Sequence, residues 1–142
     1  MIRAFKENDL SAVMQIWLDT NIKVHSFISK CYWTDNYDMV KDILPQAEVY
    51  VYEKDITNQI EGFIGLTDNY IAGLFVKENV QSEGIGKQLL DYVKDVKASL
   101  KLNVYDKNRR AIKFYQREQF VIRSETLDDN TKEKELIMVW KR

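Results

Sequence analysis

The most informative residues of this chain are Gln81-Ser82-Glu83-Gly84-Ile85-Gly86-Lys87. This stretch follows an apolar run at residues 70–76 and precedes the strongest helical pattern in the sequence, in which apolar residues recur every three or four positions: Ile85, Leu89, Val93, Val96 and Leu100. Glycine lets a ligand approach the backbone closely, and the first N–H groups of a helix have no partner within the helix. The stretch therefore predicts a strand, a loop and a helix whose start binds an anion.

Two other glycine-rich loops do not fit these residues. A phosphate-binding loop of the Gly-x-x-x-x-Gly-Lys-Ser/Thr type needs a hydroxyl residue after its lysine, but Gln88 follows Lys87, and the spacing of the glycines is also too short. A dinucleotide-binding loop needs a third glycine three residues after the second, and Leu89 holds that position. The sequence therefore excludes both of these nucleotide-binding classes.

The first third of the chain predicts two helices joined by an aromatic segment. Asn8 or Asp9 can cap a helix that runs from about Leu10 to Val24, where apolar residues recur at helical spacing. The segment at residues 27–37 is aromatic without a clear period, and a second short helix at residues 39–44 ends at the only proline. Phe27, Tyr32 and Trp33, which lie in this segment, are expected either to line a pocket or to fill a lid above it.

A short apolar run at residues 2–5 predicts a first strand, and apolar residues predict further strands at residues 49–52, 60–66, 70–76, 102–104, 120–125 and 136–140. Short turns join the three strands between residues 49 and 76 into an antiparallel meander, and Asn108 can cap a helix before the last two strands. The strand–helix–strand unit around Ile85 needs a crossover connection, which favours parallel strands at that point. The order predicts an α/β fold with a mixed, mostly antiparallel sheet.

Length and composition limit the class of protein. The 142 residues predict one domain over residues 1–142, and the net charge of -1 provides no basic field for nucleic acid or an anionic membrane. One cysteine, Cys31, and one histidine, His25, allow neither a disulfide nor a Cys/His zinc site, so we expect no metal. Cys31 is expected to be a small buried residue. We expect a cytoplasmic protein, because no signal peptide or membrane-spanning run is present.

Two motifs in the right order resemble one family. Gln81-x-x-Gly84-x-Gly86 before an amphipathic helix is similar to the acetyl-CoA motif of the GCN5-related N-acetyltransferase (GNAT) family. Asn108-x-x-Ala111-x-x-Phe114-Tyr115-x-x-x-x-Phe120 resembles that family's late helix and the strand after it. With the order of elements, the resemblance covers nearly the whole chain. It implies a GNAT fold, a mostly antiparallel twisted sheet with flanking helices.

The resemblance also implies acetyl-CoA as cosubstrate and assigns residues to it. Two strands of the family separate, and the pantetheine arm lies between them, here against the backbone of Leu74, Phe75 and Val76. The residues implied to bind the rest of the cosubstrate are Gln81, Ser82, Glu83, Gly84, Ile85, Gly86, Lys87, Asn108 and Tyr115. Tyr115 is implied to hydrogen-bond the departing thiolate. One residue departs from the pattern: Gln119 stands where the family has a glycine, so either the helix ends differently or Gln119 is strained.

The sequence does not single out one acceptor substrate, nor one group that takes the proton from it. The acceptor is expected to be a primary amine of a small molecule, a peptide N-terminus or a lysine, whose ammonium must lose a proton before it attacks. Glu53, Glu61, His25 and a chain of waters are the candidate proton acceptors. A non-catalytic acyl-CoA-binding sensor is the second hypothesis for function, and a second copy of this chain is an alternative partner.

Overall fold

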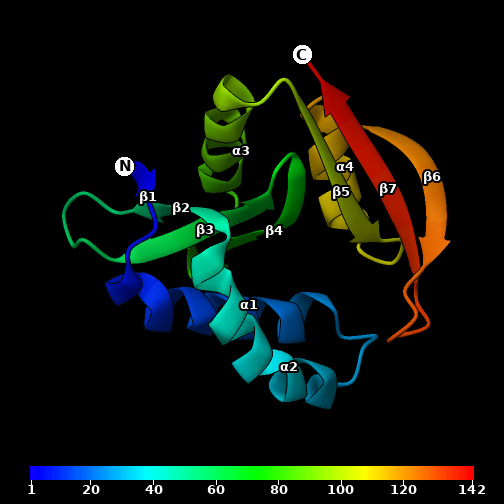
Figure 1. The fold of residues 1–142 in the computed structure, drawn as a ribbon, viewed down its shortest axis with the longest axis horizontal. Helices are drawn as coiled ribbons and strands as arrows, with labels where there is room; N and C mark the ends of the chain where they lie inside the picture. Colours follow the sequence, from blue (N-terminus) through cyan, green and yellow to red (C-terminus); the bar gives the residue numbers. More distant parts are fainter.

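The computed structural model describes residues 1–142, which form one seven-stranded sheet in the order β1-β2-β3-β4-β5-β7-β6 (Figure 1). The strands are β1 (Ile2–Ala4), β2 (Glu48–Glu53), β3 (Ile60–Thr67), β4 (Tyr70–Val76), β5 (Ser99–Tyr105), β6 (Val121–Leu127) and β7 (Lys134–Lys141). Only β4 and β5 pair in parallel, on either side of the crossover helix, and every other pair is antiparallel. The prediction of a mixed, mostly antiparallel sheet is confirmed.

Four helices cover the two faces of the sheet: α1 (Leu10–Val24), α2 (Lys30–Ile43), α3 (Ile85–Val96) and α4 (Arg109–Arg117). Buried residues of α1 and α2 form one core with the inward side chains of β2 and β3. Buried residues of α3 and α4 form a second core with the opposite face of the sheet. None of these helices combines the length and the apolar character that crossing a membrane requires.

The structure corrects three expectations. Helix α2 begins at Lys30, not at Met39, because the aromatic segment is itself helical and Ser29 caps it by accepting a hydrogen bond from the Cys31 N–H. Cys31 is exposed in the first turn of this helix and is not a core residue. Helix α3 ends at Val96, since Lys97 is already extended, and Leu100 belongs to β5.

Strands β4 and β5 separate soon after they meet. Their only paired residues are Tyr70 with Lys101 and Ile71 with Leu102. The register between β3 and β4 then shifts, which leaves Ala72 as an extra residue on β4. Such a β-bulge bends a strand and increases its twist. The bulge therefore turns the rest of β4 away from β5 and opens the sheet between them.

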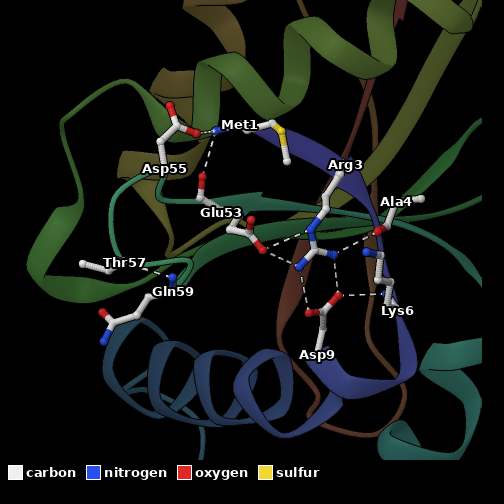
Figure 2. A network of polar contacts seen from close by, with 9 residues as sticks. All are labelled: Met1, Arg3, Ala4, Lys6, Asp9, Glu53, Asp55, Thr57 and Gln59. Carbon is white, nitrogen blue, oxygen red and sulfur yellow. Dashed lines mark hydrogen bonds and ion pairs between the residues drawn. The ribbon is translucent and has the colours of Figure 1, made fainter.

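An ion-pair network ties the short first strand to the sheet (Figure 2). The Arg3 guanidinium donates two hydrogen bonds to Asp9, at 2.8 and 3.0 Å, and two to Glu53, at 2.6 and 3.1 Å. The Arg3 side chain holds the pKa of Asp9 below its usual value, chiefly through these hydrogen bonds. The network joins β1, the turn before α1 and β2, and so fixes where α1 starts beneath the sheet.

Candidate active site

The loop between β4 and α3 presents a row of free N–H groups. None of the backbone N–H groups from Ser82 to Lys87 donates a hydrogen bond within the protein. Ser82 and Gly84 have left-handed backbone, with φ of 69° and 85°, which turns successive N–H groups toward a common side. The side chain of Gln81 ties the loop to β4 by donating to the Val76 carbonyl at 3.0 Å. This loop has the geometry of an anion-binding helix start.

One side chain of α4, that of Arg110, adds positive charge to the loop. The Arg110 guanidinium reaches across from α4 to the Ser82 Oγ at 3.0 Å. The Lys87 ammonium is already paired with Asp91 and Glu118, both at 3.1 Å, so only its backbone N–H is free to bind an anion. Arg110 was missed by the sequence analysis, although it lies within the Asn108-x-x-Ala111 motif that the analysis used.

The edge of β4 that faces the gap offers unpaired main-chain groups. The Val76 carbonyl bonds the Gln81 side chain and points away from β3, while the Lys77 N–H bonds the Glu61 carbonyl on β3. Main-chain groups alternate along a strand, so the N–H and C=O of Leu74 face the gap as well. An extended ligand amide in the gap can pair with them as a neighbouring strand would.

The gap and the loop open into one cavity of about 730 Å³. Its walls include every residue that the resemblance assigned to the cosubstrate except Glu83, whose side chain is exposed. His25 also lines the cavity, but Glu53 and Glu61 do not. Glu61 is the extra residue of a β-bulge between β2 and β3, which displaces it from the alternation that the sequence analysis assumed.

Tyr115 is buried beside this cavity with its hydroxyl unpaired. Its ring packs edge-on against Phe114, with 5.1 Å between ring centroids, and against Phe120, at 5.4 Å. The hydroxyl makes no hydrogen bond to a protein atom, and the residue lines the cavity wall. Burial raises the pKa of the Tyr115 phenol, so it stays protonated at neutral pH. Tyr115 is therefore placed to donate a hydrogen bond into the cavity.

His25 belongs to a chain of hydrogen bonds that joins α1 to α4. Asn108 accepts from the Ala111 N–H at 3.2 Å and donates through Nδ2 to His25 Nε2 at 3.3 Å. His25 Nδ1 lies 3.0 Å from the Asn21 Oδ1, and the Asn21 amide donates to the Trp17 carbonyl. Only a neutral imidazole protonated at Nδ1 fits these partners. Burial agrees, because it lowers the pKa of His25 to about 4.

His25 was a candidate proton acceptor, but its ring is neutral and both ring nitrogens are hydrogen-bonded within the protein. Its ring stacks on Trp33, with 5.5 Å between centroids and 28° between the planes, and meets Tyr105 edge-on. Neither ring nitrogen has a free lone pair to offer an incoming ammonium. His25 instead holds the capping residue Asn108 at the start of α4.

Three polar residues that the sequence analysis missed meet at the far end of the cavity. Tyr70, Asn103 and Glu135 all line its wall, and the Asn103 amide donates to the Glu135 carboxylate over a long 3.4 Å. Glu135 ends a run of alternating charges at residues 132–135, a pattern that is typical of exposed segments and so does not indicate a site. No local pattern marks these residues, since they come from three different strands.

The residues present fit acetyl-CoA. Phosphates carry the negative charge that the free N–H groups and Arg110 can bind, and the pantetheine amides match the open edge of β4 beside Leu74. Acetyl-CoA bound in this way would bring its thioester to the part of the cavity that Tyr115 lines. No other part of the chain combines these three features.

The comparisons with known proteins agree with this geometry. The model of the acetyltransferase (GNAT) domain matches residues 45–122, which hold the open strands, the loop and both motifs. This chain belongs to the GNAT family, whose members use acetyl-CoA, and it is an acetyl-transferring enzyme. The hypothesis of a non-catalytic sensor is therefore wrong.

Among characterised relatives, the chain is similar to peptidyl-lysine N-acetyltransferases of enteric bacteria. The chain is 35% identical to the peptidyl-lysine N-acetyltransferase YiaC of Escherichia coli (strain K12), over 99% of this chain and 96% of that one. It is 30% identical to the peptidyl-lysine N-acetyltransferase YjaB of Salmonella typhimurium, over 89% of this chain and 88% of that one. The solution structure of apo-form YjaB from Escherichia coli superposes with a TM-score of 0.87, at 25% identity, over 99% and 96% of the two chains.

Proposed function

We propose that this enzyme transfers the acetyl group of acetyl-CoA to the side-chain amine of a lysine in a peptide or protein. The observation that carries the proposal is the cavity that passes through the sheet between β4 and β5. The anion loop and Tyr115 lie toward the α3 and α4 side, and His25, Trp33 and Glu135 line the other end. Two relatives named for peptidyl-lysine acetylation support this acceptor.

One end of the cavity binds the cosubstrate, and the other end admits the amine. When bound, acetyl-CoA supplies a thioester whose carbonyl carbon takes the amine and whose sulfur leaves. The loop N–H groups and Arg110 bind the phosphates, and the β4 edge at Leu74 orients the arm, so that the reacting carbon is held in place. The Tyr115 hydroxyl donates a hydrogen bond to the leaving sulfur, which lowers the cost of the charge that develops there. The amine approaches from the α1 and α2 side, opposite the leaving group.

The acceptor class is tested with three matched acceptors at fixed acetyl-CoA. The first is a peptide with an acetylated N-terminus and one free lysine, the second has a free N-terminus and an acetylated lysine, and the third is a small diamine. Release of the CoA thiol is followed, and the product is located by mass spectrometry. We expect turnover with the first peptide at least tenfold above the other two. Equal or faster turnover of the second peptide or the diamine would reject the lysine assignment.

We also propose a cytoplasmic location. The support is chemical: Cys31 is exposed and unpaired, and a free surface thiol suits a reducing compartment. Fractionation of cells that carry the tagged protein tests the location, and recovery with the exported fraction would reject it.

A further inference from the structure

Glu135 lies on the acceptor side of the opened sheet. Its neighbours along β7, Leu136 and Met138, are buried in the core beneath α3 and α4. Side chains alternate along a strand, so Glu135 points to the opposite face, where α1 and α2 lie. Glu135 pairs in register with Tyr105, which packs in the core of that face. The carboxylate therefore enters the cavity from the side opposite Tyr115.

This carboxylate has no positive partner in the protein. It forms no ion pair, and its only hydrogen bond is the long one from Asn103. Glu48 and Glu53, two other partly buried carboxylates, do have cationic partners: Glu48 pairs with Lys97 at 2.8 Å and Glu53 with Arg3 at 2.6 Å. A partly buried carboxylate without a cation is costly, and a cationic ligand relieves that cost.

The groups around Glu135 also lack positive charge. Tyr70 from β4, Asp128 from the β6–β7 turn and Tyr32 from α2 surround it, and none of them is cationic. Burial and the charge of Asp128 raise the pKa of Glu135, against the hydrogen bond from Asn103. Burial and then the charge of Glu135 raise the pKa of the Tyr70 phenol. The acceptor end of the cavity is therefore a site for a positive group.

We infer that Glu135 binds the ammonium of the acceptor lysine and takes the proton that the amine must lose. The inference deepens the proposed function and rests on it. The alternatives among the side chains are weaker, because both nitrogens of His25 are bonded within the protein and Glu61 does not reach the cavity wall.

The lysine ammonium loses two protons during the reaction. One proton passes from the lysine ammonium to a Glu135 oxygen, which frees the nitrogen lone pair. The bond from nitrogen to the acetyl carbon forms, and the bond from that carbon to sulfur breaks. The second proton leaves the nitrogen for the sulfur, which the Tyr115 hydroxyl holds by a hydrogen bond. Glu135 then returns its proton to water, so the products are the acetylated lysine, the CoA thiol and one proton.

The experiment compares Glu135→Gln with wild type on two acceptors. Glutamine keeps the size of the side chain and can still accept from Asn103, but it takes no proton. For a lysine peptide at pH 7 we expect kcat/KM to fall about 10²–10⁴-fold, the usual contribution of a general base. Hydroxylamine is already neutral at pH 7, so with it as acceptor the loss should be less than tenfold. A merely structural role would lower both rates alike.

The control variant is Glu125→Gln, which removes an exposed carboxylate of β6 that pairs with Lys134. It should leave both rates within twofold of wild type. If Glu135→Gln fails to fold, Glu135→Asp keeps the charge but shortens its reach, and should show a partial loss with lysine and none with hydroxylamine. Equal rates of wild type and Glu135→Gln, or equal losses on both acceptors, would overturn the role of Glu135 as proton acceptor. The proposed function would stand in either case. Absence of lysine turnover by the wild type would overturn the proposed function and this inference with it.

Discussion

Protonation of His25 should contribute to the loss of stability of this protein at acid pH. In the folded state the ring is neutral, donates through Nδ1 to Asn21 and accepts at Nε2 from Asn108. Burial lowers its pKa to about 4, whereas an unfolded chain has a histidine pKa near 6.5. Between these two values the unfolded state binds more protons than the folded one, so stability falls as the pH falls. The neutral ring contributes fully above about pH 6.5 and loses its contribution as the pH drops toward 4.

The size of the effect follows from the two pKa values. Lowering the pH from 7 to 5 leaves folded His25 mostly neutral but protonates it almost completely in the unfolded chain, at a cost of about 2 kcal/mol. Other groups titrate in this range as well. The comparison is therefore with His25→Gln, in which those groups are unchanged and the titrating ring is absent. The difference in unfolding free energy between wild type and variant should shrink by about 2 kcal/mol over this interval.

Two assays check this reasoning. Urea unfolding of both proteins at pH 7 and pH 5 measures the difference directly. Since His25 is the only histidine, its ring resonances in an NMR titration need no assignment by mutation and give the folded-state pKa. A ring pKa of 6 or above, or a wild-type advantage that stays constant with pH, would refute the buried neutral imidazole and its bond to Asn108.

Three further predictions concern the cosubstrate site and its support. Tyr115→Phe should lower the single-turnover rate about 10²–10⁴-fold with little change in acetyl-CoA affinity, and an unchanged rate would return Tyr115 to a packing role. Gly86→Val should weaken acetyl-CoA binding at least tenfold by calorimetry, because a Cβ there already lies 3.6 Å from Phe114 and the added methyl groups crowd the cavity, whereas Gly86→Ala should be mild. Gln119→Gly should raise the free energy of unfolding in urea by about 1 kcal/mol, since Gln119 has a left-handed φ of 75° at the end of α4. The matched change Gln116→Gly inside α4 should lower it by a similar amount, and destabilisation by Gln119→Gly would contradict the strain.

The features that the sequence predicted best are local ones. The loop before α3 and the cap at Asn108 were predictable because glycine, helix periodicity and capping act over a few residues. The strain at Gln119 was predicted as one of two alternatives, and the structure shows that the backbone keeps the left-handed turn despite the missing glycine. The bonds from the Phe120 N–H to the Tyr115 carbonyl and from the Gln119 N–H to the Gln116 carbonyl close the helix in the usual way.

The features that the sequence did not predict depend on distant residues. The first part of α2, before residue 39, was missed because its aromatic residues pack against α1, as Trp33 does on Trp17 at 5.9 Å between centroids. That contact, and not exposure to water, sets the pattern of polar and apolar residues there. The bond between His25 and Asn108 joins residues 83 positions apart, and the approach of Asn103 to Glu135 exists only because β5 and β7 are neighbours. Both pairs are too far apart in the sequence for a local pattern to indicate them.

The extra residue at Ala72 has a consequence for the molecule as a whole. Because β4 and β5 share only two residue pairs, the sheet consists of two halves, β1 to β4 and β5 to β7, that meet at a narrow seam. The cosubstrate arm that we propose to bind along Leu74 would take the place of the missing neighbour strand and supply the hydrogen bonds that the seam lacks. We therefore expect bound acetyl-CoA to join the two halves of the sheet as well as to react.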